Sequence, residues 1–272
     1  MHSRTPAGIL VILVILLSLA GGCTSPASSG GTATPVHETV VKDTTLPAEP
    51  AGTAAPVSTA QKESIAQQLA SVRSTSPVWL EAYRMFRNIK STEYVHPPYT
   101  DDDAAGVYKF DCLGFVDHVL MNATPQAYQE IGKGANPSIE SYAAAFSRLD
   151  TKSPVARYGT RVARPIDLQP GDVCLWLKPT TLDSGHMWII AGEPEVNPKR
   201  GGEVLVRIFD STGTVHSHDS RSGSAFKTGL GSGILGFMVD GEGNPAGLYW
   251  EGGASTSAGE KDTTIVCGRL AR

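Results

Sequence analysis

Two residues whose types suit covalent catalysis stand where apolar segments begin. Cys112 opens a helix-spaced apolar run directly after Asp111. A thiol at a helix start lies at the positive end of the helix dipole, which favours the thiolate. Later in the chain, His186 precedes the strongly apolar run 187–190, which predicts a β-strand. A cysteine and a histidine are the nucleophile and base of a cysteine-dependent acyl-transfer site, provided that the fold brings them together.

Taken alone, each residue has a more ordinary interpretation, because free cysteines are often small core residues and a histidine often ends a strand. Taken together, they predict Cys112 as the nucleophile and His186 as the general base that returns its proton to the leaving amine. Asp210 ends a later β-branched run and is the expected acceptor that orients the imidazole, with a turn role as the alternative. Glu193 and Glu195 are weaker candidates for the same task.

The elements that must position these residues change in character along the chain. Amphipathic, helix-spaced patterns come first, at 78–89, 112–121, 125–131 and 138–149, with residues 90–108 expected to be a loop. Short β-branched runs between turn residues follow, at 172–177, 187–191, 204–209, 234–239, 248–250 and 264–270. This order predicts an α+β fold with N-terminal helices packed on an antiparallel sheet. The helix that carries Cys112 is then expected to lie against the strand that carries His186.

The N-terminal residues predict export. The apolar run 9–20 is short for a membrane span and is followed by small residues, as in an export signal. The segment 1–23 resembles a prokaryotic lipoprotein signal, in which Cys23 would carry the lipid. Ala20 departs from that pattern, because such signals usually have leucine there. Ordinary cleavage, or no cleavage, is the alternative.

The next segment predicts a tether. Residues 24–75 begin with a Ser-, Thr-, Gly- and Pro-rich stretch that cannot bury enough apolar surface to fold, and a marginal helix is expected over 59–73. Ser76 and Pro77 suit the first turn of a helix, so we expect the folded domain to span 76–272. The net charge of −4, with no basic cluster, argues against a nucleic-acid partner.

Several other clusters have ordinary interpretations. His216 and His218 could ligate zinc, but no further Cys or Glu lies at a suitable spacing, so a polar loop is expected, either on the surface or lining the cleft, and no metal is predicted. The glycine-rich segment 229–233 predicts a turn, 101–103 a solvated loop, and His118 a structural helix residue. Cys174 and Cys267 either form a disulfide or remain as two buried thiols.

Three motifs, in order along the chain, resemble those of NlpC-type cell-wall peptidases. They are Asp111-Cys112-Leu113-Gly114-Phe115-Val116, Leu168-Gln169-Pro170-Gly171-Asp172-Val173 and the segment 184–192, Ser-Gly-His-Met-Trp-Ile-Ile-Ala-Gly. The resemblance implies a papain-like fold and hydrolysis of amide bonds in peptidoglycan stem peptides, without a cofactor. It also implies that Cys112 is the nucleophile, His186 the base and Asp210 the third member. The protein would then act in the cell envelope, anchored to the membrane through its N-terminal segment.

Departures from the family pattern leave the substrate open. Leu113 replaces the usual serine, and Trp188 replaces a small residue near the histidine. The substrate side of the site is expected to include Tyr94, Tyr108, Asp111 and Trp188. If Leu113 and Trp188 filled the cleft, the chain would be an envelope-binding lipoprotein without activity. The same Cys–His pair could also serve an acyltransferase or a deamidase.

Overall fold

All five described helices precede the strands of the main sheet, as the sequence predicts. Our description rests on a computed structural model and covers residues 59–178, 185–261 and 263–271. Five helices are described: α1 (Thr59–Ala70), α2 (Pro77–Asn88), α3 (Cys112–Ala123), α4 (Pro125–Gly132) and α5 (Ile139–Phe146). The expected α+β class is confirmed. Among the described residues, no helix is both long and apolar enough to cross a membrane.

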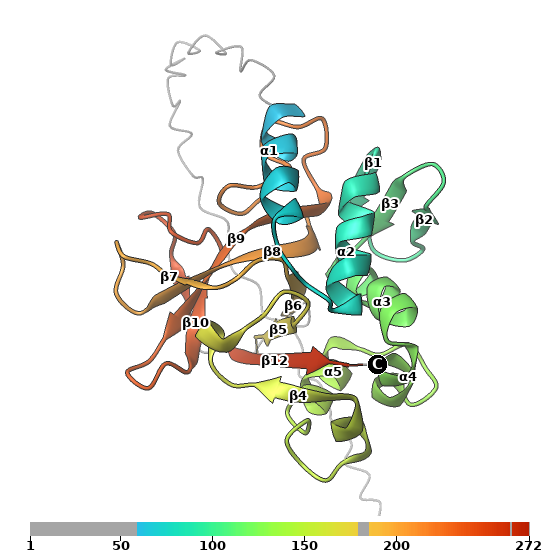
Figure 1. Ribbon diagram of the computed structural model, residues 1–272, viewed down its shortest axis with the longest axis vertical. Helices are drawn as coiled ribbons and strands as arrows, with labels where there is room; N and C mark the ends of the chain where they lie inside the picture. The colour runs from blue at the N-terminus through green and yellow to red at the C-terminus, as the bar shows by residue number, and fades with distance from the viewer. Residues whose placement is uncertain (1–58, 179–184, 262, 272) are drawn as a thin grey trace, which may run out of the picture. The chain divides into compact units, whose positions relative to one another are not determined.

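The main sheet has nine strands in the described part of the chain. They are β4 (Gly159–Val162), β5 (Val173–Leu177), β6 (Gly185–Ile190), β7 (Glu195–Val196), β8 (Glu203–Thr212), β9 (Gly229–Val239), β10 (Pro245–Tyr249), β11 (Gly259–Glu260) and β12 (Thr264–Leu270). Their order is β11-β10-β9-β8-β6-β5-β12-β4, with β7 paired to β8 (Figure 1). All pairs are antiparallel, and Ile189 of β6 faces Phe209 of β8. This register places the residues after Phe209 beside the beginning of β6.

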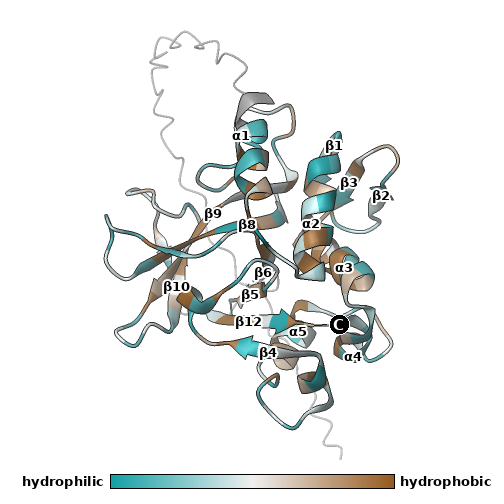
Figure 2. Ribbon diagram, viewed as in Figure 1, coloured by the Kyte–Doolittle hydropathy of each residue, from teal (hydrophilic) through white to brown (hydrophobic). Residues whose placement is uncertain are grey.

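Helix α2 shows how local sequence produces the packing. The Ser76 hydroxyl accepts a hydrogen bond from the Trp79 amide, and Pro77 occupies the first turn, so the helix begins where the sequence predicts. One face, which includes Val78 and Phe86, is buried, and apolar and polar residues alternate along α2 in Figure 2. The Trp79 indole donates to the Ala191 carbonyl at 2.9 Å. This bond ties α2 to the end of β6.

The hydrophobic core has two parts. The first cluster contains apolar residues of the helices together with Met187 and Ile189 of β6. The second contains Trp188 and Ile190, the alternate residues of the same strand, together with Phe237 of β9. A strand that is apolar on both faces must be covered on both faces. Strand β6, which carries His186, is therefore held rigidly in the middle of the protein.

Helix α1 belongs to the folded unit and not to a tether. Its Ile65 and Leu69 are buried in the first cluster, and the Lys62 ammonium donates to the Ile89 carbonyl at 2.9 Å. The sequence-based domain start at 76 is therefore too late, because a short amphipathic helix gains its stability from the neighbour on which it packs. Cys23 and the segment 24–58 lie outside the described residues.

The segment expected to be a loop contains a small sheet. Strands β1 (Ser91–Tyr94), β2 (Thr100–Asp102) and β3 (Val107–Phe110) pair in the order β1-β3-β2. Alternate residues of β3, Tyr108 and Phe110, are buried, whereas the residues between them are half-buried. Asp101 and Asp102 are exposed, so this acidic segment is solvated as predicted, but they lie in strand β2 and not in a loop. The Asp101 carboxylate is 2.9 Å from the His118 ring. The alternation in 107–110 was too short to stand out in the sequence.

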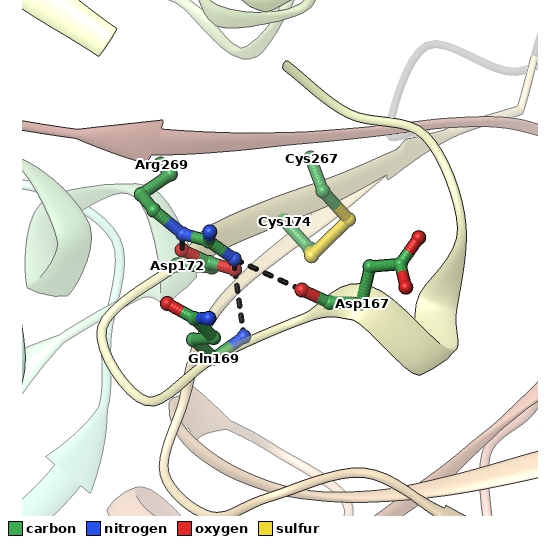
Figure 3. The surroundings of a disulfide bond; sticks show 6 residues. All are labelled: Asp167, Gln169, Asp172, Cys174, Cys267 and Arg269. Carbon is green, nitrogen blue, oxygen red and sulfur yellow. Dashed lines mark hydrogen bonds and ion pairs between the residues drawn. A yellow bond between two sulfur atoms is a disulfide. The ribbon is translucent and has the colours of Figure 1, made fainter. Parts of the chain in front are cut away.

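A disulfide joins two neighbouring strands of the main sheet. Cys174 of β5 and Cys267 of β12 face each other in register, with their sulfurs bonded at 2.09 Å. Next to it, Arg269 of β12 binds both oxygens of Asp172 at 2.8 Å each (Figure 3). Of the two alternatives left open by the sequence, the structure shows the paired one.

Helix α3 also buries a carboxylate against α5. The Tyr142 hydroxyl donates to Asp117 at 2.6 Å, and burial raises the pKa of Asp117 to about 7. The folded protein thus keeps a proton that the unfolded chain releases near its ordinary value of 3.8, so stability present below that pH is lost as the pH rises to about 7. Asp117→Asn, which keeps an acceptor for Tyr142, should therefore raise the free energy of unfolding more at pH 8 than at pH 4. Urea unfolding at both pH values tests this, and an equal effect at the two would contradict it.

Candidate functional site

The N-terminus of α3 places Cys112 at the start of a well-anchored helix. The Asp111 carboxylate caps the helix by accepting a hydrogen bond from the Gly114 amide at 2.7 Å. Phe115 and Val116 of the same helix are fully buried in the first cluster. Cys112 is the free cysteine of the described residues, and its side chain is largely buried. The thiol thus sits among the unpaired backbone N–H groups of the first helical turn.

The side chains of Cys112 and His186 meet. Burial lowers the pKa of His186, but the charge of the neighbouring Cys112 sulfur and the hydrogen bonds to Cys112 and Asp210 outweigh it. Together they raise the pKa of His186 from 6.5 to about 9. An imidazole in this setting holds its proton more firmly than usual. The arrangement therefore favours a protonated imidazole beside the Cys112 sulfur.

Asp210, near the end of β8, orients the imidazole. The Nε2 atom of His186 lies 2.8 Å from Oδ2 of Asp210, which leaves Nδ1 as the ring nitrogen that can face the thiol. The Asp210 side chain is fully buried. Burial raises the pKa of Asp210, but the charges of Arg221 and His216 and two imidazole hydrogen bonds hold it well below its ordinary value. Asp210 is therefore an ionised acceptor, in the place where the sequence predicts one.

A second histidine binds the same carboxylate oxygen. The Nε2 atom of His216 lies 2.9 Å from Oδ2 of Asp210, and its Nδ1 lies 2.8 Å from the Trp250 carbonyl oxygen. The His216 ring is packed against the Trp250 ring, with centroids 4.2 Å apart. His216 lies in a loop, as the sequence predicts, but on the side of the site and not on the surface: its side chain is buried, whereas His218, two residues later, is exposed.

Behind Asp210 lies a buried arginine that the sequence analysis missed. Arg221 is only 2% exposed, and its Nη2 donates to Asp210 at 2.8 Å and to Asp219 at 2.7 Å. Its Nε donates to the other Asp219 oxygen at 2.8 Å, and its Nη1 to the Gly229 carbonyl at 2.6 Å. A guanidinium bound on several sides in this way is rigid. It fixes the position of the Asp210 carboxylate.

Two glycines of β9 make room for this cluster. A Cβ atom on Gly231 would lie 2.7 Å from Nε of Arg221, and one on Gly233 would lie 2.6 Å from Cβ of His216. Any larger residue at either position would collide with the buried network. The sequence-based prediction of a turn at 229–233 was wrong because these glycines are strand residues whose missing side chains admit their neighbours. Glycine at alternate strand positions was the available signal for a close approach.

A metal ion is a further possibility for this cluster. His186, Asp210 and His216 each offer a ligand atom, and these atoms lie within 4.8 Å of one another. Both Nε2–Oδ2 separations, 2.8 and 2.9 Å, have hydrogen-bond length. The Arg221 guanidinium already supplies a positive charge to the same carboxylate. The two histidines and Asp210 are therefore better suited to hydrogen bonds with one another than to binding a metal cation.

Tyr99 is a second residue that the sequence analysis missed. Its hydroxyl donates to Asp111 at 2.8 Å, and its ring lies so close to Gly114 that a Cβ there would be 2.6 Å from it. Nδ1 of His96 lies 3.1 Å from the other Asp111 oxygen. Burial and the Asp111 carboxylate raise the pKa of the Tyr99 hydroxyl. Tyr99 is partly exposed and thus offers a phenol to solvent next to the nucleophile.

Of the four residues expected on the substrate side, two lie near the site and two are buried in the protein. Asp111 and Tyr94 remain near the site: Asp111 caps α3, and the half-buried Tyr94 ring packs edge-on against His96 at 5.5 Å. Tyr108 is fully buried and its hydroxyl bonds to Asp103, so it cannot contact a substrate. Trp188 is fully buried in the second cluster, with its ring stacked 5.9 Å from that of His186. Both predictions of a substrate contact were wrong because the aromatic rings are needed in the core.

The bulky residue that follows the nucleophile also packs inward. Leu113 is partly buried against the first cluster. Trp188 cannot fill the cleft, because it is fully buried in the second cluster, whereas the half-buried Leu113 packs against the first cluster with part of its side chain exposed. Residues 179–184, directly before β6, lie outside the described part of the chain.

Comparison of the chain with protein-family models, with curated proteins and with solved structures finds no match.

Proposed function

We propose that the protein is a cysteine hydrolase with a papain-like arrangement, in which Cys112 attacks an amide carbonyl. The observation that carries the proposal is the contact between a thiol at a helix start and an imidazole held by a buried carboxylate. A helix that carries the nucleophile and packs on the strand that carries the base also supports the papain-like part of the proposal.

The reaction follows from the geometry. The Cys112 thiolate forms a bond to the carbonyl carbon, and N–H groups at the start of α3 stabilise the oxyanion. The His186 imidazolium gives its proton to the leaving amine as the C–N bond breaks. His186 then takes a proton from water, which attacks the thioester and releases the acid. Asp210 keeps the ring in one orientation throughout.

The proposed substrates are peptides of the cell envelope, of the peptidoglycan stem type. Support comes from the three sequence motifs that resemble those of the NlpC type, two of which contain Cys112 and His186. The Cys174–Cys267 disulfide supports a site of action outside the cytoplasm, because such bonds persist mainly in oxidising compartments. We further propose that the N-terminal segment, through Cys23, anchors the protein to the membrane.

Product analysis tests the proposal. The full chain is incubated with purified peptidoglycan and with synthetic stem peptides in water enriched in oxygen-18. Mass spectrometry should find cleaved peptides whose new carboxylates carry the heavy oxygen. Protein alkylated at Cys112 with iodoacetamide is the control and should release no fragments. Cleavage that persists after alkylation, or a wall left intact by unmodified protein, would reject the hydrolase. Transfer or deamidation products would assign the same thiol to another reaction.

The raised pKa of His186 sets an upper pH limit for the reaction. The imidazolium that donates to the leaving amine is present below about pH 9 and is lost as the pH rises through that value. We therefore expect kcat to fall above about pH 9. A histidine with the ordinary pKa of 6.5 would instead lose its proton, and the rate would fall, near pH 6.5. Initial rates between pH 6 and pH 10 measure this limit. In Asp210→Asn, which removes the negative charge, the limit should move to lower pH; an unmoved limit would contradict the assignment.

A further inference from the structure

The hydrogen bonds of His216 determine where its protons are. Its Nδ1 lies 2.8 Å from the Trp250 carbonyl oxygen, which carries no proton, so this nitrogen must be the donor. Its Nε2 lies 2.9 Å from the Asp210 carboxylate. That carboxylate also accepts from Arg221 and from His186, so it is ionised and has no proton to give. The second nitrogen of His216 must therefore donate as well.

We propose that His216 is a positioning residue, an imidazolium buried beside Asp210 that sets how strongly this carboxylate acts on His186. Both imidazoles bind the same oxygen, Oδ2. The positive charge of His216 therefore offsets part of the negative charge that His186 experiences. This inference rests on the proposed function only where it concerns the rate of hydrolysis, because the protonation of His216 is a property of the resting protein.

The charges in the cluster support a cationic His216. Asp210 and Asp219 are two fully buried carboxylates, and Arg221 supplies one buried positive charge. A second positive charge on His216 makes this group of four neutral. With a neutral His216, these four groups would carry one net negative charge, and Arg207, which acts on Asp219, would be the positive charge left to offset it at the Asp210 end of the cluster. A neutral His216 would also leave one ring nitrogen without a proton against an acceptor, so hydrogen bonding and charge balance point to the same protonation state.

The groups that face His216 come from several elements. From β8 it faces Asp210, and from β6 it faces His186, whose ring centroid is 6.4 Å away. From its own segment, the Asp219 carboxylate accepts from the His216 backbone amide at 2.9 Å. Arg221 reaches the cluster through Asp210 and Asp219, and the Trp250 ring covers one face of the imidazole. Arg207 of β8 also interacts electrostatically with Asp219.

The positive charge has a function in the proposed reaction. Asp210 without His216 would hold the His186 imidazolium more firmly, because an unscreened carboxylate in a buried site attracts it more strongly. An imidazolium held too firmly gives up its proton to the leaving amine more slowly. His216 thus moderates the carboxylate and keeps its oxygen in place.

A spectroscopic experiment tests the protonation directly. The full chain is labelled with nitrogen-15 in histidine, and the His216 signals are assigned by their loss in His216→Gln. Long-range proton–nitrogen correlation spectra at pH 7 should show two protonated ring nitrogens for His216. One unprotonated nitrogen would overturn the proposal. Spectra recorded with EDTA should be unchanged, and a change on chelation would overturn it by showing a metal ion in place of the proton.

The same spectra, recorded across pH, test the effect on His186. In His216→Gln the titration midpoint of His186 should rise by about one pH unit, because a buried positive charge is lost a few ångströms away. His218→Asn is the matched control; asparagine tolerates the positive φ of 46° at this position, and the midpoint should stay unchanged. An equal midpoint in His216→Gln and wild type would overturn the proposal. If His216→Gln does not fold, the wild-type spectra still decide the protonation. Neither of these two measurements needs a substrate, so their outcome does not depend on whether the protein is a hydrolase.

Discussion

Replacement of Cys112 by alanine should lower the rate of amide hydrolysis by about 10⁴-fold or more, as in other enzymes that lose their nucleophile. The sulfur supplies the bond to the substrate carbonyl, and within the described residues the other two cysteines are joined in the disulfide. Cys112→Ser should be nearly as inactive, because the His186–Asp210 pair is arranged for a thiolate and serine has a much less acidic group. Rates of fragment release from purified wall, measured by mass spectrometry, check both variants.

The controls for this experiment come from the same helix. His118 lies on α3, 2.9 Å from the Asp101 carboxylate and outside the site, so His118→Gln should retain activity whereas His186→Gln should lose it. Cys112→Ala, Cys112→Ser and His118→Gln should unfold in urea within about 1 kcal/mol of the wild type, as expected for small changes that leave packing intact. Undiminished release by Cys112→Ala would place catalysis elsewhere in the chain.

Replacement of Arg221 by methionine should destabilise the protein by about 3–5 kcal/mol, because it leaves two buried carboxylates without their shared cation. Asp210 and Asp219 are both fully buried, and each binds the guanidinium at less than 3 Å, at 2.8 and 2.7 Å. Activity should fall as well, by about 10²-fold, because Asp210 would no longer be held where it orients His186. Urea unfolding and initial rates measure the two effects.

A surface arginine provides the matched control. Arg164 binds Asp167 at 2.7 Å, but both side chains are about half exposed, so Arg164→Met should leave unfolding and activity almost unchanged. Arg221→Lys should fall between Arg221→Met and wild type, because lysine keeps the charge but lacks the planar fork that binds both carboxylates. Wild-type stability in Arg221→Met would show that Arg221 does not hold the cluster together.

The parts of the fold that could be predicted are those with strong local signals. The cap at Ser76, the Asp111 cap and the apolar spacing of α3 define their helices without reference to the rest of the chain. Strands β5, β6 and β8 are long apolar runs bounded by turn residues. Their order along the chain was enough to expect that Cys112 and His186 would meet and that Asp210 would follow, and these three residues are brought together.

The rest of the site depends on tertiary contacts that a single sequence does not reveal. The segment with His216 and Arg221 is polar, and polar segments usually form exposed loops. Its burial depends on the ion pairs with Asp210, which a single sequence does not reveal. Gly231 and Gly233 lack side chains because others occupy their space, yet glycine in a sequence first indicates a turn. The burial of Tyr108 and Trp188 likewise depends on distant strands that cover them.

The order of the strands constrains when the protein can finish folding. Strand β12 lies between β4 and β5, and the disulfide that joins it to β5 spans a separation of 93 residues. During synthesis, β4 and one edge of β5 therefore remain unpaired until residues 264–270, which form β12, have left the ribosome. Pairings between such distant segments form slowly and leave open strand edges exposed in the meantime. A chain that crosses a membrane unfolded would complete this sheet only on arrival, so that assembly of the sheet and oxidation of its cysteines would coincide there.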